Sequence, residues 1–275
     1  MQTSVLSKSV KIKTPGFSLA NTLECGQCFR AEKLAENSYL VFAGARSAIF
    51  TQEGESILCS EETYQDFSVF WEHYFDLDTD YSSLLDGFCG DPFLETACQQ
   101  VSGIHILRQE PWEALCSFIL SANNNIPRVK GIVNRLCAQF GSKIPNGYSF
   151  PSAQRLAACT VEELAPIRAG FRARYLLDAA QKVSSSTVSL ATIAEADLQT
   201  ARNELLQIKG VGKKVAECAL LYGFHRLDAF PIDVWMNRVL TQYYPSGVSL
   251  QVQSCPGVAQ QILFHYIRTV SKNNA

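Results

Sequence analysis

The chain contains 275 residues, of which 47% are apolar and 18% are charged, the composition of a globular protein with one large or two modest domains. Residues 1–14 are polar and no run of eighteen or more apolar residues occurs, so we expect no signal peptide, no membrane span and an intracellular location. The net charge of −2 argues against a nucleic-acid binder that is basic over its whole surface.

The charge is unevenly distributed along the chain. Residues 1–100 hold 6 Lys and Arg against 15 Asp and Glu, a net charge of −9, whereas residues 101–275 hold 18 against 11, a net charge of +7. Such an imbalance usually reflects only a solvated face. It also suits a C-terminal part that binds DNA, because neutralising phosphates supplies much of the affinity for DNA.

The first ninety residues have the pattern of a small antiparallel sheet. Alternating segments, separated by turn signals at Gly44 and Gly54, cover residues 38–43, 45–51 and 57–59. A helical stretch opens at Ser60, and beyond about residue 91 strand signals nearly vanish. We therefore expect an α+β fold, mostly α, with a β-rich domain over residues 1–92 and a helical domain over residues 93–275, whose last helix packs back on the first domain.

Several helix starts in the second part are marked by capping residues. Asp91 precedes a proline at the first helical position, and residues 160–163 and 192–195 have the pattern of a capping box. Asp233 follows Pro231 at the position of a helix N-cap. These signals predict helices that begin near residues 92, 161, 193 and 234.

The ten cysteines are scattered singly through apolar segments, which is typical of buried free thiols in a reducing compartment. Cys25 and Cys28 form the only close pair, and no second pair or histidine cluster completes a zinc site. An iron–sulfur cluster needs four clustered cysteines, whereas only Cys218 and Cys255 occur after residue 210. We expect no bound metal cluster.

A glycine-bracketed turn between two helical patterns is the most informative motif of the chain. Apolar residues recur at helical spacing on both sides of Gly210 and Gly212, which predicts helix, tight turn and helix over about residues 201–224. The backbone N–H groups of such a turn, with Lys213 beside them, suit a phosphate. Taken alone, the glycines also fit an ordinary helix C-cap followed by a new helix.

Lys214 and Asp233 turn this motif into a candidate catalytic site. A lysine amine is nucleophilic only when it is unprotonated, and a low-dielectric setting or a neighbouring cation such as Lys213 favours that state. A carboxylate nineteen positions later can stabilise positive charge that develops on a sugar. Asp233 alone reads equally well as a helix cap, and the two roles are compatible.

The hairpin with Lys214 and Asp233 resembles the helix-hairpin-helix DNA glycosylases of the endonuclease III superfamily, and more narrowly the 8-oxoguanine DNA glycosylases, which excise the oxidised base and nick the strand. Four further segments carry the resemblance, residues 26–30, 117–128, 171–175 and 257–264. The resemblance implies that Lys214 attacks the sugar C1′, that Asp233 stabilises the developing charge, and that a Schiff base then permits β-elimination.

The resemblance also implies how the flipped base is recognised. Gly26 corresponds to the residue whose backbone carbonyl accepts the N7–H that only the oxidised guanine carries. Cys218 and Phe264 correspond to the residues that sandwich the base, and Gln260 to the one that reads its Watson–Crick edge. From the residues alone, Gly26 is a turn glycine, and periodicity places Cys218 and Phe264 in the core.

On the opposite strand, the resemblance implies that Asn123 fills the space of the flipped nucleotide and that Arg128 and Arg172 bind the estranged cytosine. Phe171 is then an apolar wedge in the duplex. The three asparagines at 123–125 also fit a helix terminus followed by a new helix at Ile126. The expected partner is double-stranded DNA containing 8-oxoguanine, bound by a monomer without a cofactor, apart from a monovalent or divalent cation that the hairpin could hold.

Three residues depart from the family pattern. Trp235 stands where a histidine near the lesion phosphate is expected, Phe171 replaces a tyrosine, and Cys28 replaces a serine. Two other functions fit part of the pattern. One is a non-catalytic DNA-structure-binding protein that uses only the hairpin, and the other is a related glycosylase with a different target base.

Overall fold

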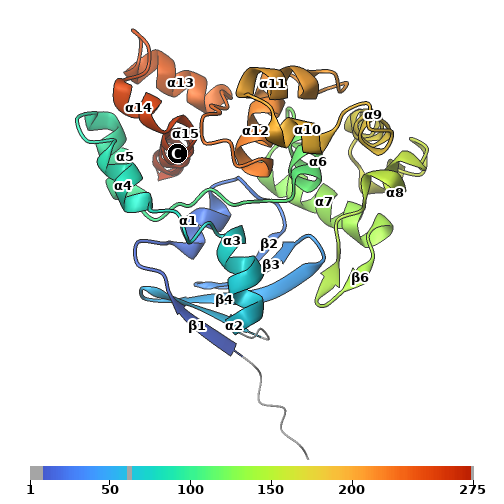
Figure 1. Cartoon of the computed structure of the whole chain (residues 1–275), viewed down its shortest axis with the longest axis horizontal. Helices are drawn as coiled ribbons and strands as arrows, with labels where there is room; N and C mark the ends of the chain where they lie inside the picture. The colour runs from blue at the N-terminus through green and yellow to red at the C-terminus, as the bar shows by residue number, and fades with distance from the viewer. Residues whose placement is uncertain (1–8, 61–63, 274–275) are drawn as a thin grey trace, which may run out of the picture.

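The computed structural model describes residues 9–60 and 64–273, and combines an antiparallel sheet with a larger helical part (Figure 1). In Figure 1 the strands lie at the bottom of the view and most of the helices lie above them. The α+β fold expected from the sequence is therefore confirmed. The start of the helix predicted after Ser60 falls on residues 61–63, which lie outside the described residues.

The sheet has five antiparallel strands in the order β1-β5-β4-β3-β2. Their bounds are β1 Ser9–Lys13, β2 Ala31–Ala35, β3 Ser38–Ala43, β4 Arg46–Glu53 and β5 Ser56–Ser60. The three predicted strands are β3, β4 and β5, and they form the expected meander. The two edge strands β1 and β2 were not predicted, because β1 lies in a polar segment and only the first residue of β2 is buried.

One face of the sheet packs on aromatic side chains because its strands alternate. Tyr39 lies opposite Phe50, and Phe50 lies opposite Cys59, so buried residues face buried residues. The Phe50 ring is 4.9 Å from the rings of both Trp71 and Phe75. Trp71 belongs to the helical segment that covers the sheet, built from α2 Tyr64–Asp66, a π-helical turn at Phe67–Trp71 and α3 Glu72–Tyr74, and Phe75 is the C-cap of that segment.

The rest of the chain is helical, apart from a short hairpin of β6 Lys143–Ile144 and β7 Gly147–Tyr148. In the sheet region, α1 Leu19–Glu24 connects β1 to β2. The other helices are α4 Tyr81–Asp86, α5 Pro92–Gln100, α6 Pro111–Ser121, α7 Ile126–Phe140, α8 Ala153–Ala157, α9 Arg172–Ser184, α10 Leu190–Glu195, α11 Leu198–Leu206, α12 Lys213–Gly223, α13 Val234–Tyr243, α14 Leu250–Ser254 and α15 Pro256–Asn273.

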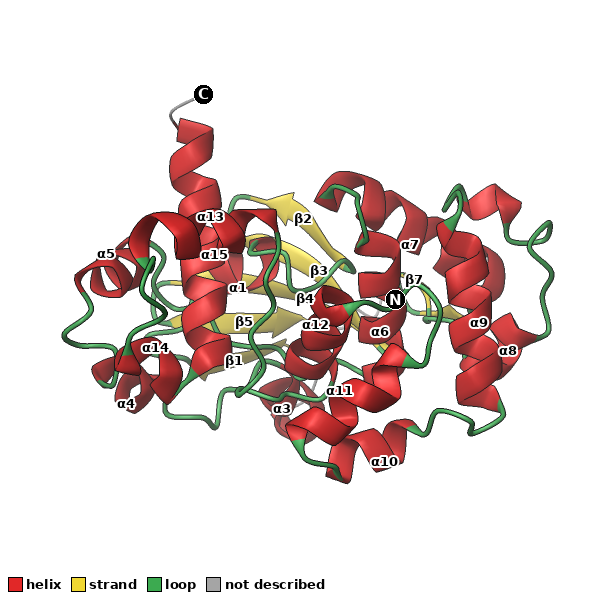
Figure 2. Ribbon diagram, turned by 90° about the horizontal axis from the view of Figure 1, so that it is seen from above, coloured by secondary structure: helices red, strands yellow, loops and turns green. Residues whose placement is uncertain are grey.

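Helices α6 and α12 pack side by side at the centre of the helical part (Figure 2). They approach closely at Gly223, where an added Cβ would lie 2.9 Å from the Cβ of Ala114. Burial along α12 is continuous from Val215 to Gly223. This packing holds the first turn of α12, which carries Lys214, against the last turn of α6.

The capping signals were right at two helix starts and misleading at two others. Asp91 accepts from the amides of Phe93 and Leu94, and Asp233 caps α13. Thr160 and Glu163 form the reciprocal capping hydrogen bonds, but a turn and a 3-10 helix at Ala165–Ile167 follow instead of an α-helix. The cap at Thr192 is wrong, because Ser189 caps α10 three residues earlier.

The domain boundary at residues 92/93 stays a prediction. Phe29, Tyr81 and Phe88, which precede it, pack in the helical core, whereas Leu107, which follows it, packs in the sheet core.

The C-terminal helix reaches the N-terminal segment through the bond from Gln261 to the Cys25 carbonyl. Within the described residues no disulfide joins any of the ten cysteines, and eight of them are buried, as expected. No helix of the described part is long and apolar enough to cross a membrane.

Candidate active site

The predicted helix-hairpin-helix is formed by α11, residues 207–212 and α12. Gly210 adopts a φ of +82°, and the Val211 amide donates to the Ile208 carbonyl at 3.1 Å, which closes the turn. An added Cβ at Gly210 would lie 2.2 Å from the Tyr175 ring. Both the left-handed backbone and the close approach of the ring therefore require glycine at this position.

The hairpin is anchored on α9 by polar contacts. The Lys209 amide donates to Asp178 Oδ2 at 2.8 Å, and Lys182 Nζ donates to the Gln207 carbonyl at 2.6 Å. Burial opposes ionisation of Asp178, but these donors outweigh it and lower its pKa. Gly212 is the N-cap of α12 and offers no side-chain acceptor, so no capping side chain takes up the first-turn amides. This arrangement suits an anion such as phosphate.

Lys214 is the second residue of α12 and is half-buried. Its Nζ lies 3.4 Å from Ser121 Oγ, at the end of α6, and 5.2 Å from the centre of the Phe118 ring. The hydrogen bond is long, and the ring contact is a cation–π attraction that leaves the N–H groups without a conventional acceptor. The amine is therefore held in place with capacity left for a substrate.

A single cavity brings the predicted catalytic and base-binding residues together. It is lined by nine residues from five segments of the chain, Gly26, Phe118, Lys214, Cys218, Tyr222, Pro231, Asp233, Gln260 and Phe264. Six of these were singled out in the sequence. Phe118, Tyr222 and Pro231 were not, because Phe118 and Tyr222 lie on helices at core spacing and nothing in their local pattern separates a cavity wall from a core contact.

Asp233 enters the cavity as the N-cap of α13. Its Oδ1 accepts from the Met236 amide at 2.9 Å, which fixes the carboxylate. Among the residues that the structure describes, Asp233 and Lys214 form no ion pair within 4 Å, although both line the cavity. A carboxylate and an amine thus line the same cavity without forming an ion pair.

The walls of the cavity are apolar at Cys218 and polar at Gln260. Burial raises the pKa of Cys218 although Lys214 opposes this, so the residue is a neutral thiol. Gln260 is buried, and its Oε1 lies 3.4 Å from the Tyr222 hydroxyl. Cys218, Gln260 and Phe264 all line the cavity.

Gly26 lies on the loop after α1 with a φ of +93°. The next residue, Gln27, is completely buried and fixes the loop through its side chain, which donates to the carbonyls of Thr22 and His105 and accepts from the Leu107 amide. The backbone at Gly26 is therefore held in a conformation that other residues rarely adopt.

The residues expected on the opposite strand gather beside the cavity. Arg172 is buried and donates to the carbonyls of Ala122 and Asn123 at 2.7 and 2.6 Å, which ties α9 to the loop after α6. Burial and the neighbouring Arg128 lower the pKa of Arg172, so the two cations face the same region. Phe171 is 55% exposed, and the Arg172 guanidinium lies 4.4 Å above its ring.

The asparagine segment forms the helix terminus that was left open as an alternative. Asn123 has a φ of +49°, and Asn125 caps α7 by accepting from the Arg128 amide at 3.0 Å. Lys213 is exposed and is not among the residues that line the cavity. Trp235, one of the three residues that depart from the family pattern, has its ring centre 4.8 Å from the Arg238 guanidinium.

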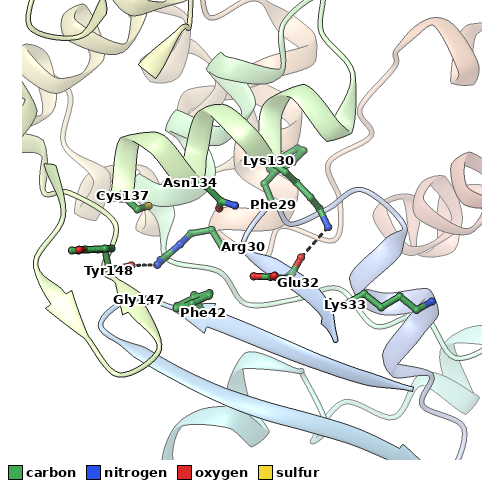
Figure 3. Close-up of a pocket in the computed structure, with 11 residues that line it drawn as sticks. Phe29, Arg30, Glu32, Lys33, Phe42, Lys130, Asn134, Cys137, Gly147 and Tyr148 are labelled. Carbon is green, nitrogen blue, oxygen red and sulfur yellow. Dashed lines mark hydrogen bonds between the residues drawn. The ribbon is translucent and has the colours of Figure 1, made fainter. Parts of the chain in front are cut away.

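A second, wider pocket lies apart from Lys214, between β2, β3, α7 and the β6–β7 hairpin (Figure 3). Its polar groups are largely bonded to each other. Arg30 donates to Glu113 and to the Tyr148 carbonyl, and Lys130 donates to the Ala31 carbonyl at 2.9 Å. Burial raises the pKa of Cys137 to about 12, so its thiol is a poor nucleophile. The cavity at Lys214 is therefore the better candidate for catalysis.

Within residues 9–60 and 64–273, no group of three or more His, Cys, Asp or Glu side chains is arranged to hold a metal ion. The polar groups that line the cavity at Lys214 include an amine, a carboxylate, an amide and the Tyr222 hydroxyl.

Comparison with known proteins agrees with this geometry. Residues 9–115 match the model of the 8-oxoguanine DNA glycosylase N-terminal domain, and residues 116–249 match that of the HhH-GPD superfamily of base excision DNA repair proteins. The N-glycosylase/DNA lyase of Saccharomyces cerevisiae is 32% identical over 82% of this chain and 68% of its own length. The N-glycosylase/DNA lyase OGG1 of Arabidopsis thaliana is 31% identical over 56% of this chain and 44% of its own length.

Solved structures are similar over nearly the whole chain. The 8-oxoguanine glycosylase/lyase of Clostridium acetobutylicum, in complex with double-stranded DNA containing cytosine opposite 8-oxoG, superposes with a TM-score of 0.88 at 32% identity, covering 98% of each chain. MBOgg1 in complex with a low-affinity DNA ligand gives a TM-score of 0.89 at 37% identity, covering 96% of each chain. The chain therefore belongs to the 8-oxoguanine DNA glycosylase family of the helix-hairpin-helix base-excision repair proteins.

Proposed function

We propose that this protein, a bifunctional DNA N-glycosylase and DNA lyase, excises 8-oxoguanine from duplex DNA with Lys214 as the nucleophile and prefers cytosine on the opposite strand. The observation that carries the proposal is the single cavity that collects Lys214, Asp233 and the four base-binding candidates from distant parts of the chain. Binding phosphate through the hairpin alone would need none of these side chains.

The proposed reaction begins with a nucleotide flipped out of the duplex into this cavity. The Lys214 amine attacks C1′ of the sugar, the bond from C1′ to the base breaks, and the base leaves after taking up a proton. Opening of the sugar ring gives a Schiff base between Lys214 and C1′. Loss of a C2′ proton then breaks the bond from C3′ to its oxygen and nicks the strand.

Asp233 has an electrostatic role in this proposal. Positive charge builds on the sugar as the base departs, and a carboxylate that is already fixed by the Met236 amide needs no reorganisation to stabilise it. The Gly26 carbonyl would accept the N7–H of 8-oxoguanine and repel the N7 lone pair of guanine.

The preference for cytosine is assigned to Arg128 and Arg172. Cytosine presents two adjacent acceptors, O2 and N3, that two guanidinium groups can satisfy together. Their common location beside Asn123 supports this assignment, since Arg172 is tied to that loop. Phe171, exposed next to them, would then enter the duplex as an apolar wedge.

The proposal is tested by incubating the protein with an 8-oxoguanine:cytosine duplex and borohydride, which reduces a Schiff base to a stable adduct. We expect a covalent protein–DNA adduct with the wild type and none with Lys214→Gln, which should still bind the lesion duplex. Absence of the wild-type adduct would contradict the lyase mechanism. Equal excision opposite all four bases would contradict the roles of Arg128 and Arg172.

A further inference from the structure

Arg268 lies at the edge of the base-binding cavity without belonging to any motif of the sequence. It lies on α15 one turn after Phe264 and two turns after Gln260 and Gln261, so these side chains share one face of the helix. Two of the four, Gln260 and Phe264, line the cavity. The other two, Gln261 and Arg268, point their donors at the loop that carries Gly26.

Both donors converge on one backbone carbonyl. Gln261 Nε2 donates to the Cys25 carbonyl at 3.3 Å, and Arg268 Nη1 donates to the same oxygen at 3.4 Å. Gln261 is completely buried, and its Oε1 accepts from the Tyr222 hydroxyl at 2.5 Å. The peptide that precedes Gly26 is thus connected to both α12 and α15.

Arg268 also packs against the cavity wall. Its guanidinium lies 4.9 Å above the Phe264 ring, and an added Cβ at Gly26 would lie 3.2 Å from its Nη1. Burial lowers the pKa of Arg268, although Asp233 opposes this, so the cation lies within electrostatic reach of the catalytic carboxylate. One side chain therefore contacts the loop and one wall of the cavity.

A glycine needs such support if its carbonyl is to select a base. Gly26 can exchange positive for negative φ at little cost, and this exchange would turn its carbonyl away from the cavity. Gln27 holds the peptide after Gly26 through its bonds to the interior. The peptide before Gly26 is held by Gln261 and Arg268 at the Cys25 carbonyl.

We propose that Arg268 is a positioning residue for lesion recognition, which fixes the Cys25–Gly26 peptide and the Phe264 ring so that the Gly26 carbonyl faces the flipped base. This inference rests on the proposed function, because it assigns Arg268 to the step in which 8-oxoguanine is distinguished from guanine. Cleavage of a preformed abasic site presents no base to that carbonyl and therefore depends on Lys214 but not on this contact.

The test compares Arg268→Leu, Arg268→Lys and the exposed neighbour Thr269→Ala as a matched control on the same helix. We expect Arg268→Leu to lower kcat/KM for excision of 8-oxoguanine opposite cytosine about 10-fold more than it lowers cleavage of an abasic-site duplex. Arg268→Lys should show an intermediate loss, because it keeps the charge but not the planar contact with Phe264. Thr269→Ala should match the wild type in both assays.

Binding measured in the Lys214→Gln background separates recognition from chemistry. The ratio of the dissociation constants for guanine:cytosine and 8-oxoguanine:cytosine duplexes should fall about 10-fold when Arg268→Leu is added. An unchanged ratio, or equal losses in excision and abasic-site cleavage, would overturn the inference. Wild-type protein that does not excise 8-oxoguanine would instead overturn the proposed function itself.

Discussion

Two polar clusters, one at Asp76 and one at Lys214, lie near opposite ends of α12 and differ in how fully their hydrogen bonds are made. Asp76 is completely buried, and its carboxylate accepts from Thr79, Tyr81, Arg108 and His225. Lys214 makes a long hydrogen bond to Ser121, a hydrogen bond to the Cys218 thiol and an aromatic contact. A saturated carboxylate stabilises the fold, whereas a sparsely bonded amine keeps its capacity for substrate.

The two clusters are connected through the helix that they share. His225, just beyond the end of α12, bonds to Asp76 on the segment that covers the sheet, and the first turn of α12 presents Lys214 to the cavity. The Asp76 cluster therefore anchors one end of the helix whose other end carries Lys214, the proposed nucleophile. Changes in the first cluster should appear in stability, and changes in the second should appear in catalysis.

Asp76→Asn is expected to have the largest effect. It leaves Arg108 and His225 without their buried acceptor charge, and breaking a buried ion pair in this way typically costs about 3–5 kcal/mol. Urea unfolding should show this loss in the free energy of unfolding at neutral pH. The excision rate per folded molecule should be close to that of the wild type, and a rate that falls while stability does not would break the comparison.

Asp233→Asn is the complementary change at the catalytic end. Asparagine caps a helix about as well as aspartate, so the bond to the Met236 amide and the stability should be preserved. The negative charge is lost, and removing one electrostatic contact to a transition state commonly lowers kcat about 10²–10³-fold. Single-turnover excision of 8-oxoguanine measures this loss. A fall in melting temperature that parallels the loss of rate would mean that Asp233 is only a cap.

Sequence reasoning reached the site better than the details of the fold. The hairpin glycines and the Asp233 cap were predicted because tight turns and helix caps require particular residue types at fixed spacing, whereas the candidate role of Lys214 rested on amine chemistry and on the family resemblance. The edge strands β1 and β2 gave weak signals, since one lies in a polar segment and the other is mostly exposed. Thr192 was misassigned because Ser189, three residues earlier, also fits a cap, and only the backbone shows which one is used.

Residues that reach the cavity only through the packing of helices could not be predicted from the sequence. Phe118, Tyr222 and Arg268 come from different helices, and their positions around Gly26 depend on how those helices pack. Periodicity places each of them on a helix face but not against a cavity. The tertiary arrangement, and not the local pattern, decides which apolar face becomes a wall.

Gly210→Ala and Gly212→Ala form a matched pair that separates backbone strain from loss of glycine. Alanine at Gly210 must keep a φ of +82° and avoid the Tyr175 ring, so we expect a loss of about 2–3 kcal/mol in the free energy of unfolding, together with weaker DNA binding. Gly212 has a φ of −96° and no atom within 4 Å of an added Cβ, so alanine there should cost less than about 1 kcal/mol. Equal losses would mean that the hairpin is not held against Tyr175.

Lowering the pH to 5 is expected to have the smallest effect on stability, and to act through His105, which lies beside Asp76. Burial lowers the pKa of His105 to about 4 from 6.5, while its Nδ1 lies 3.1 Å from the Asp76 carbonyl and its ring stacks on Tyr81. Because the folded pKa is the lower one, stability is complete above pH 6.5 and falls between pH 6.5 and 4, as the unfolded chain takes up a proton.

At pH 5 the free energy of unfolding should be lower by about 2 kcal/mol. This pH lies about 1.5 units below the ordinary pKa of 6.5, and each unit corresponds to about 1.4 kcal/mol. Asp76 also loses its contribution as the pH falls, but only below pH 3.8, because its hydrogen bonds lower its pKa against the effect of burial. Urea midpoints at pH 7 and pH 5 should therefore differ for the wild type and much less for His105→Asn, whose amide can still donate to the backbone carbonyls. The same pH dependence in both proteins would place the titrating group elsewhere. His105 would then not contribute to the pH dependence of stability in the Asp76 region.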